Sequence, residues 1–197
     1  MLFDNNLFTV EKKLLSILLM TIGSVAISFN GLVLRNIETA DDWTIIFYRA
    51  LSFSISIFIY LFFIHKKRIF KKIMQIGISG LIGGFVLGIS NVCFILSMTT
   101  TSVANTVFTI SLIPFITALF SLLILKEKLA QITVYTMIAA FFGVLMMFYG
   151  SLKIGELWGN MLALITAISF SIYTIIIRSN KNIDMLPCLL ISGIMAM

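Results

Sequence analysis

The chain has few charged, metal-binding and sulphur-containing side chains, and each shortage excludes a class of function. Only 11% of its 197 residues are charged, whereas soluble domains carry about 25%. It has one histidine and two cysteines, and Cys93 and Cys188 form no CxxC-type pair. We therefore expect no disulfide framework, no metal site and no cofactor.

Acidic residues are missing from the interior of the long apolar stretches. The eight aspartates and glutamates lie at the termini, in loops or at stretch ends, at Asp4, Glu11, Glu38, Asp41, Asp42, Glu127, Glu156 and Asp184. The single histidine, His65, opens a basic loop. An enzyme within a membrane would need a nucleophile with a base, or a metal set, at one depth. We therefore expect no enzyme, and no buried acidic proton relay in this part of the protein.

Apolar residues, by contrast, make up 60% of the chain. They form six stretches, at roughly 14–34, 43–64, 73–98, 102–125, 129–149 and 157–177. A helix needs about 20 such residues to cross a bilayer. The sequence therefore predicts an all-α membrane protein, built as a polytopic bundle of transmembrane helices.

The positive charge falls on alternate gaps between these stretches. Eleven basic residues lie in one set of gaps, at Lys12, Lys13, Lys66, Lys67, Arg68, Lys71, Lys72, Lys126, Lys128, Arg178 and Lys181. The other gaps hold only Arg35 and Lys153. Because cytoplasmic loops carry the excess of Lys and Arg, we expect a multi-pass inner-membrane protein with a cytoplasmic N-terminus. The net charge of +6 then needs no nucleic-acid partner. The basic run 65–72 would meet anionic lipid headgroups, or serve as a dedicated binding loop.

Polar residues within the stretches are the candidates for a substrate site. Arg49 lies about 9 Å inside the outer end of the second stretch, where a charge is costly and tends to face the bundle interior. Its alternative is to snorkel outwards, toward Asp42. Asn91, Asn105 and Thr109 come from the outer parts of neighbouring stretches. We expect Arg49 and these three to bind substrate, although ordinary interhelical hydrogen bonds would also explain the polar residues.

Two features concern helix shape. Gly80, Gly84 and Gly88 recur every four residues, so one helix face consists of small residues that let a neighbouring helix approach closely. A glycine-lined passage is the alternative. Pro114 lies midway along the fourth stretch and is expected to kink that helix, and a bent helix at this depth often borders a cavity.

The region after the third stretch resembles a known family. The run SMTTTSVANTVFTISLIPFITALFSLLILKEKL (97–129) has Pro114 in mid-helix and Glu127 at the following turn, and AAFFGVLMMFYG (139–150) follows. With Arg49 early in the second stretch, this pattern resembles the EamA-type module of the drug/metabolite transporter superfamily. Two departures concern Ser97, where the family usually has alanine, and Thr136–Ile138, which lacks a glycine often found there.

The resemblance implies a domain organisation. Residues 1–13 would be a cytoplasmic segment, 14–149 a first five-helix module, and 157–197 the start of a second, incomplete module. An odd number of helices requires the second copy to be inverted, and ISFNGLVLR (27–35) aligns weakly with FSIYTIIIR (170–178). The last apolar part, about 185–197, would reach about 20 Å, short of a ~30 Å hydrocarbon core. We therefore expect a fragment of a longer permease or a truncated reading frame.

The function that the resemblance implies is secondary transport by alternating access between two modules. The transported partner would be a small organic metabolite, and membrane lipids are the other expected partner, with a homodimer left open. The alternative is a non-transporting membrane protein, or a truncated remnant of a permease without activity of its own.

Overall fold

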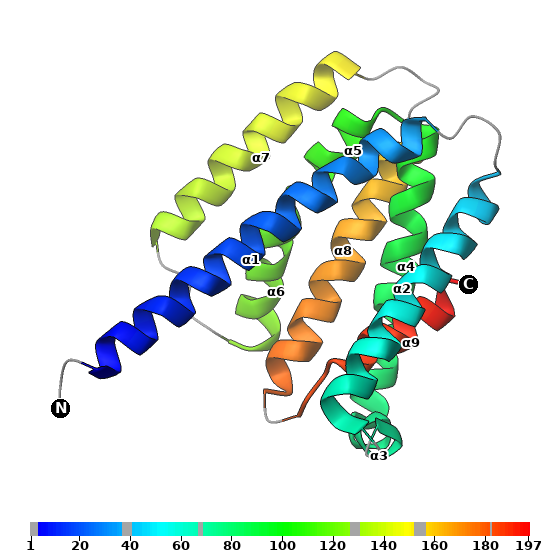
Figure 1. The fold of residues 1–197 in the computed structure, drawn as a ribbon. Coiled ribbons are helices and arrows are strands. Elements are labelled where there is room, and N and C mark those ends of the chain that lie inside the picture. The colour runs from blue at the N-terminus through cyan, green and yellow to red at the C-terminus, as the bar shows by residue number, and fades with distance from the viewer. Residues whose placement is uncertain (1–3, 37–40, 67–68, 127–130, 152–156, 182) are drawn as a thin grey trace. The chain divides into compact units, whose positions relative to one another are not determined.

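The computed structural model describes residues 4–36, 41–66, 69–126, 131–151, 157–181 and 183–197 (Figure 1). Within these ranges the secondary structure is helical and contains no strand. The helices are α1 (Asp4–Arg35), α2 (Asp42–His65), α3 (Ile69–Gln75), α4 (Gly77–Thr100), α5 (Val103–Ile110), α6 (Ile113–Ile124), α7 (Gln131–Ser151), α8 (Leu157–Ser179) and α9 (Pro187–Met195).

The chain divides into two compact units, Met1–Thr39 and Ala40–Met197. The first unit contains α1, whose hydroxyl side chains bond back to their own helix. Thr21, Ser24 and Ser28 each donate to the carbonyl four residues earlier, at 2.9 Å. These bonds satisfy the hydroxyls within the helix, which suits polar groups in an apolar segment. The second unit contains α2 to α9.

Four helical segments of the described residues are long and apolar enough to cross a membrane. They are Asp42–Ile64, Gly77–Thr100, Val103–Ile124 and Leu157–Ser179. This result confirms the polytopic helical bundle. The other two expected spans lie within α1 and α7, where the apolar segments found are the shorter Leu14–Ala26 and Gln131–Gly143. Those two spans stay predictions.

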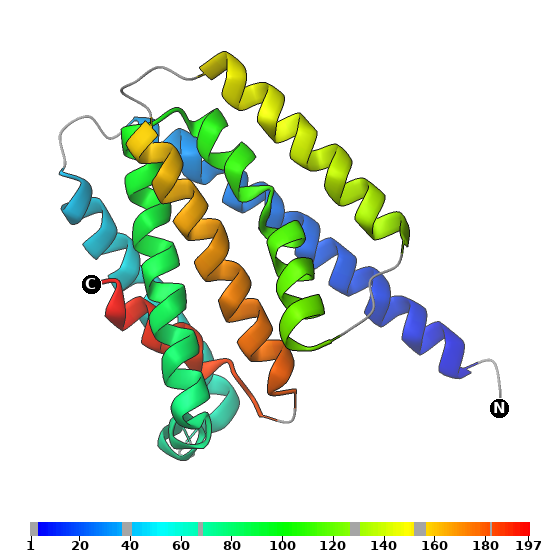
Figure 2. The ribbon, with the colours of Figure 1, turned by 180° about the vertical axis from the view of Figure 1, so that it is seen from behind.

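Helix α4 is at the centre of the second unit. It packs along α8 over most of its length and also contacts α9, α2 and α5. Figure 2 shows α4 and α8 side by side, with α9 crossing α4 obliquely. On the α8 side of this interface, Ala163 and Ala167 are fully buried. Small residues let the two backbones approach closely, and Ser90 on α4 reaches across to donate to the Thr166 carbonyl at 3.1 Å.

The third span begins at Gly77 and not at residue 73. The short helix α3 precedes it, and the backbone turns at Gly77, which has φ +58°. Glycine adopts this left-handed conformation without the steric cost that a side chain would bring. Ile76, immediately before it, is only 2% exposed. The apolar run at 73–76 therefore contains the end of α3 and the buried residue that precedes α4. Hydropathy alone does not separate these two helices.

The fourth span consists of two helices, α5 and α6, separated at Ser111 and Leu112. Pro114 is the second residue of α6, and its missing N–H leaves the Ile110 carbonyl without the usual donor four residues later. The Ser171 hydroxyl on α8 donates to the Ile113 carbonyl at 3.2 Å. The interruption is thus held by a hydrogen bond from the neighbouring helix, as expected for irregular backbone at membrane depth.

Candidate functional site

Arg49 lies on the inward-facing side of α2. Ile46, Ala50 and Phe53 are three residues before it, one after it and four after it, so these side chains cluster along one side of the helix. Ile46 and Ala50 are buried, while Arg49 is half-buried. The helix therefore places a guanidinium beside an apolar stripe that packs into the bundle.

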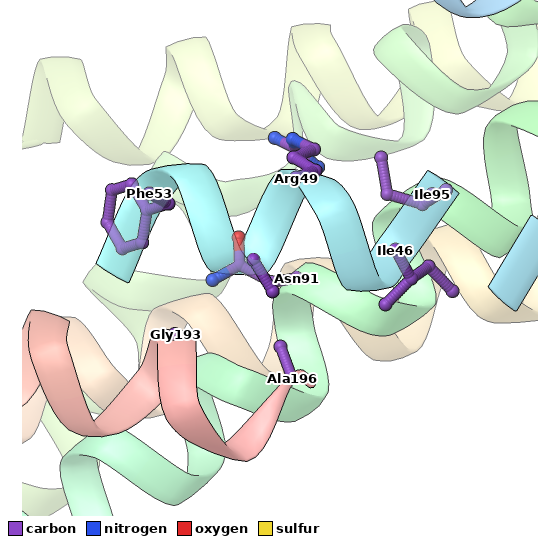
Figure 3. Close-up of a pocket in the computed structure, with 8 residues that line it drawn as sticks. Ile46, Arg49, Phe53, Asn91, Ile95, Gly193 and Ala196 are labelled. Atoms are coloured by element: carbon purple, nitrogen blue, oxygen red, sulfur yellow. The ribbon is translucent and has the colours of Figure 1, made fainter. Parts of the chain in front are cut away.

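This side of α2 borders a small cavity, drawn in Figure 3. Its volume is about 90 Å³. The lining residues come from three helices and the residue that caps the last of them: Ile46, Arg49, Ala50, Phe53, Asn91, Ile95, Gly193 and Ala196. Arg49 and Asn91 are the polar side chains among them. The structure thus brings together two of the four residues expected to bind substrate.

An aromatic ring of α4 supports the guanidinium. The guanidinium carbon of Arg49 lies over the ring of Phe94, 5.3 Å from its centroid. This distance is within the range of a cation–π interaction. Phe94 follows Asn91 by three residues, so both project from the same side of α4. Among the described residues no ion pair joins Arg49 to Asp42, the partner that the snorkelling alternative would use.

The third wall of the cavity depends on a close approach of α9 to α2. A Cβ added at Gly193 would collide with the Ser54 hydroxyl and would lie 3.3 Å from the Phe53 ring. A side chain at Gly193 therefore requires the Ser54 hydroxyl to move and the Phe53 ring to shift slightly. The Ser54 hydroxyl is buried, and among the described residues it has no hydrogen-bond partner.

The three glycines of α4 have different neighbours. A Cβ added at Gly84 would lie 2.6 Å from the Ile191 side chain, and one at Gly88 would lie 3.1 Å from α9. At Gly80 the added atom would collide with Ile76, in the turn before the same helix. Two of the three glycines therefore lie against α9, which also closes the Arg49 cavity.

Asn105 and Thr109 do not line this cavity. Thr109 is 1% exposed, and its hydroxyl donates to the Asn105 carbonyl at 2.9 Å. The Asn105 side-chain amide donates to the Thr101 hydroxyl at 3.4 Å, and this hydroxyl donates to the side-chain oxygen Oδ1 of Asn160 on α8 at 3.3 Å. These two candidates thus belong to a second polar cluster, which joins α4, α5 and α8.

Ser97 makes two further hydrogen bonds between the same three helices. Its Oγ donates to the Gly159 carbonyl at 2.8 Å and lies 2.8 Å from the Thr106 hydroxyl. A serine hydroxyl has one proton to donate, so Thr106 must be the donor in the second bond. Both side chains are fully buried. The serine that departs from the usual alanine of the resembled family therefore ties three helices together.

Sequence reasoning missed three residues of these sites. Phe94 was identifiable as the residue three after Asn91, but nothing in its type marked it as a partner of Arg49. Asn160 and Gly193 lie beyond the stretches where polar residues had been singled out, and only packing brings them to the clusters. Glu127, assigned to a cytoplasmic turn, lies outside the described residues.

Comparison with known proteins gives one match. The sequence profile of the EamA-like transporter family matches residues 14–149, which is more than half of the chain. Neither a search of curated proteins nor a search of solved structures finds a match. The matched range contains both Arg49 and the α4 residues that face it. The chain is a polytopic membrane protein of the EamA-like transporter family, within the drug/metabolite transporter superfamily.

Proposed function

We propose that the protein is a secondary transporter that carries a small organic metabolite across the inner membrane, with its N-terminus in the cytoplasm. The observation that carries this proposal is the Arg49 cavity. It contains a half-buried guanidinium on a membrane-spanning helix, beside an amide from a second helix. Ionisable residues within spans are rare, and they commonly mark substrate or ion pathways.

The position of the cavity supports alternating access. Six of its lining residues belong to α2 and α4, within the range 14–149, whereas Gly193 and Ala196 belong to the later range 157–197. Transporters built from inverted repeats place their substrate sites where the two repeats meet. A cavity lined by residues of both ranges is therefore the place where a bound solute would be exposed first to one side of the membrane and then to the other.

The contacts of the walls indicate which parts would move. Helix α8 is bonded to the first range by Ser97, Ser90 and Ser171, and these bonds fix it to α4 and α6. Helix α9 packs more extensively on α4 than on α2, and α2 shares few contacts with α4. We infer that α2 moves relative to α4, α8 and α9, so that the Arg49 cavity opens between α2 and α4.

Solute flux in reconstituted vesicles tests this function. The full chain is incorporated into lipid vesicles, and uptake of a panel of labelled amino acids, nucleosides, organic acids and sugar phosphates is compared with protein-free vesicles. We expect at least one solute to enter faster with the protein, and this uptake to fall strongly in Arg49→Ala. A correctly inserted protein that moves no solute of the panel would instead support the non-transporting alternative.

A further inference from the structure

We propose, on the basis of the transport function above, that the Arg49 cavity takes a short aliphatic monocarboxylate. Three properties of the cavity support this substrate class: the sign and number of its charges, its hydrogen-bonding groups and its apolar walls. A larger groove between α8 and α9 is lined by Arg178, Lys181 and Asp184, but it is more open than the Arg49 cavity.

The charge of the lining favours a single negative charge on the ligand. Among the described lining residues, Arg49 is the one ionisable side chain. A cationic ligand would be repelled by the guanidinium. A dianion would bring one charge that finds no positive partner in the cavity, and unpaired charges are costly away from water. One guanidinium therefore matches one carboxylate.

The hydrogen-bonding groups also fit a carboxylate. A guanidinium presents five N–H donors in a planar fork, and this fork binds the two oxygens of a carboxylate side by side. The interaction with the Phe94 ring, at 5.3 Å, is not a hydrogen bond and so leaves these donors available. The Asn91 amide supplies a donor for a further oxygen, such as the keto oxygen of a 2-oxo acid.

The rest of the lining is apolar. Ile46 is 4% exposed and Ile95 is 1% exposed, and Ala50, Phe53 and Ala196 complete the walls. Such walls favour a hydrocarbon group, because they release water from it on binding. Of the lining side chains that the structure describes, only Asn91 offers an acceptor to the several hydroxyls of a sugar or to the ammonium of an amino acid, and buried polar groups need such partners.

The size of the cavity limits the length of the ligand. Its volume of about 90 Å³ is well below the roughly 300–1,000 Å³ of sites for drug-sized ligands. We therefore expect a branched chain of a few carbons to fit. A long fatty acid would have to leave most of its chain outside.

Counterflow with a poorly permeant acid tests the substrate class. Vesicles containing the full chain are loaded with unlabelled 3-methyl-2-oxobutanoate, and entry of the labelled compound is measured. This acid is ionised at pH 7, so little of it crosses the lipid unaided. We expect entry above that of protein-free vesicles, with at least about a tenfold loss in Arg49→Ala, which is the loss of one charged hydrogen-bonded contact. The matched control is Phe85→Leu. Phe85 lies on α4 outside the Arg49 cavity, so this variant should transport at the parent rate.

Competitors that differ in charge then separate this proposal from the transport function itself. We expect 3-methylbutanoate to inhibit entry at least about tenfold better than its amide, its amine analogue or methylsuccinate, and octanoate to inhibit poorly. Equal inhibition by the amide would overturn the carboxylate assignment. If the protein takes up only cationic, neutral or dianionic solutes, it is a transporter but the proposed substrate class is wrong. Movement of no solute at all would overturn the transport function. These competition results come from the parent protein, so they hold even if Arg49→Ala fails to fold.

Discussion

The guanidinium carbon of Arg49 on α2 lies 5.3 Å from the centroid of the Phe94 ring on α4. This contact links two helices that share fewer contacts with each other than each shares with α9. It gives a charge within a membrane span a partner that is not an acid, and cation–π contacts of this kind contribute about 0.5–2 kcal/mol. The ring therefore holds the guanidinium at the cavity without neutralising it.

We predict that Phe94→Leu weakens transport mainly through substrate affinity. Leucine keeps the apolar bulk but removes the ring face, so loss of about 1 kcal/mol would raise KM about fivefold with little change in the maximal rate. Phe94→Tyr keeps the ring and should stay within about twofold of the parent. Initial uptake rates over a range of solute concentrations measure both parameters. A leucine variant with the parent KM, or a tyrosine variant as weak as leucine, would refute the positioning role.

Gly84→Ala should destabilise the protein. The new methyl group would lie 2.6 Å from the Ile191 side chain and 3.0 Å from the Cys188 carbonyl, so α4 and α9 must separate at a cost of about 1–3 kcal/mol. Gly143→Ala is the matched control, because its added methyl group meets nothing within 4 Å. Thermal unfolding in detergent compares the two. Equal midpoints for the two variants would show that α9 does not pack on this glycine.

Ser97→Ala should also lower stability, by about 0.6–1.7 kcal/mol. It removes the bond to the Gly159 carbonyl and leaves the fully buried Thr106 hydroxyl without its acceptor. Ser56→Ala is a suitable control, since the Ser56 hydroxyl is exposed and bonds only within its own helix. Unfolding midpoints of both variants are measured beside the parent. If Ser97→Ala and Ser56→Ala have the same unfolding midpoint, the hydrogen bonds of Ser97 add no net stability.

The charge pattern predicts which loops are cytoplasmic. A cysteine introduced at position 69 should be shielded from an impermeant thiol reagent in intact cells, and one at position 154 should react. The native Cys93 and Cys188 are half-buried and buried, so they contribute little background. The opposite labelling pattern would invert the proposed topology.

The helical bundle could be predicted from sequence because hydropathy and helix length are local properties. The spans Asp42–Ile64 and Leu157–Ser179 agree with the expected stretches to within two residues. The break before Gly77 was not predictable in the same way. Its residues are apolar on both sides, and the turn depends on a backbone angle and on the burial of Ile76, neither of which hydropathy reports.

The candidate site was predictable only in part. The cost of a charge in a span identified Arg49, and Asn91 was identified as a polar residue at a similar depth. Asn105 satisfied the same criteria, but its helix face turns toward Asn160 on α8, away from the Arg49 cavity. Depth can be read from a sequence, whereas the direction of a helix face depends on packing. The same limit explains why Gly193 was missed.

Uptake by Arg49→Lys and Arg49→Ala, at matched amounts of protein in vesicles, tests most directly whether the guanidinium contacts the transported solute. If it does, alanine should lower kcat/KM at least about tenfold. Lysine should recover only part of the loss, because an ammonium cannot bind a carboxylate with a planar fork. If Arg49 only snorkels outward, lysine should work nearly as well as arginine and alanine should cost little. Parent rates in both variants would remove Arg49 from the site and contradict the proposed function of the cavity.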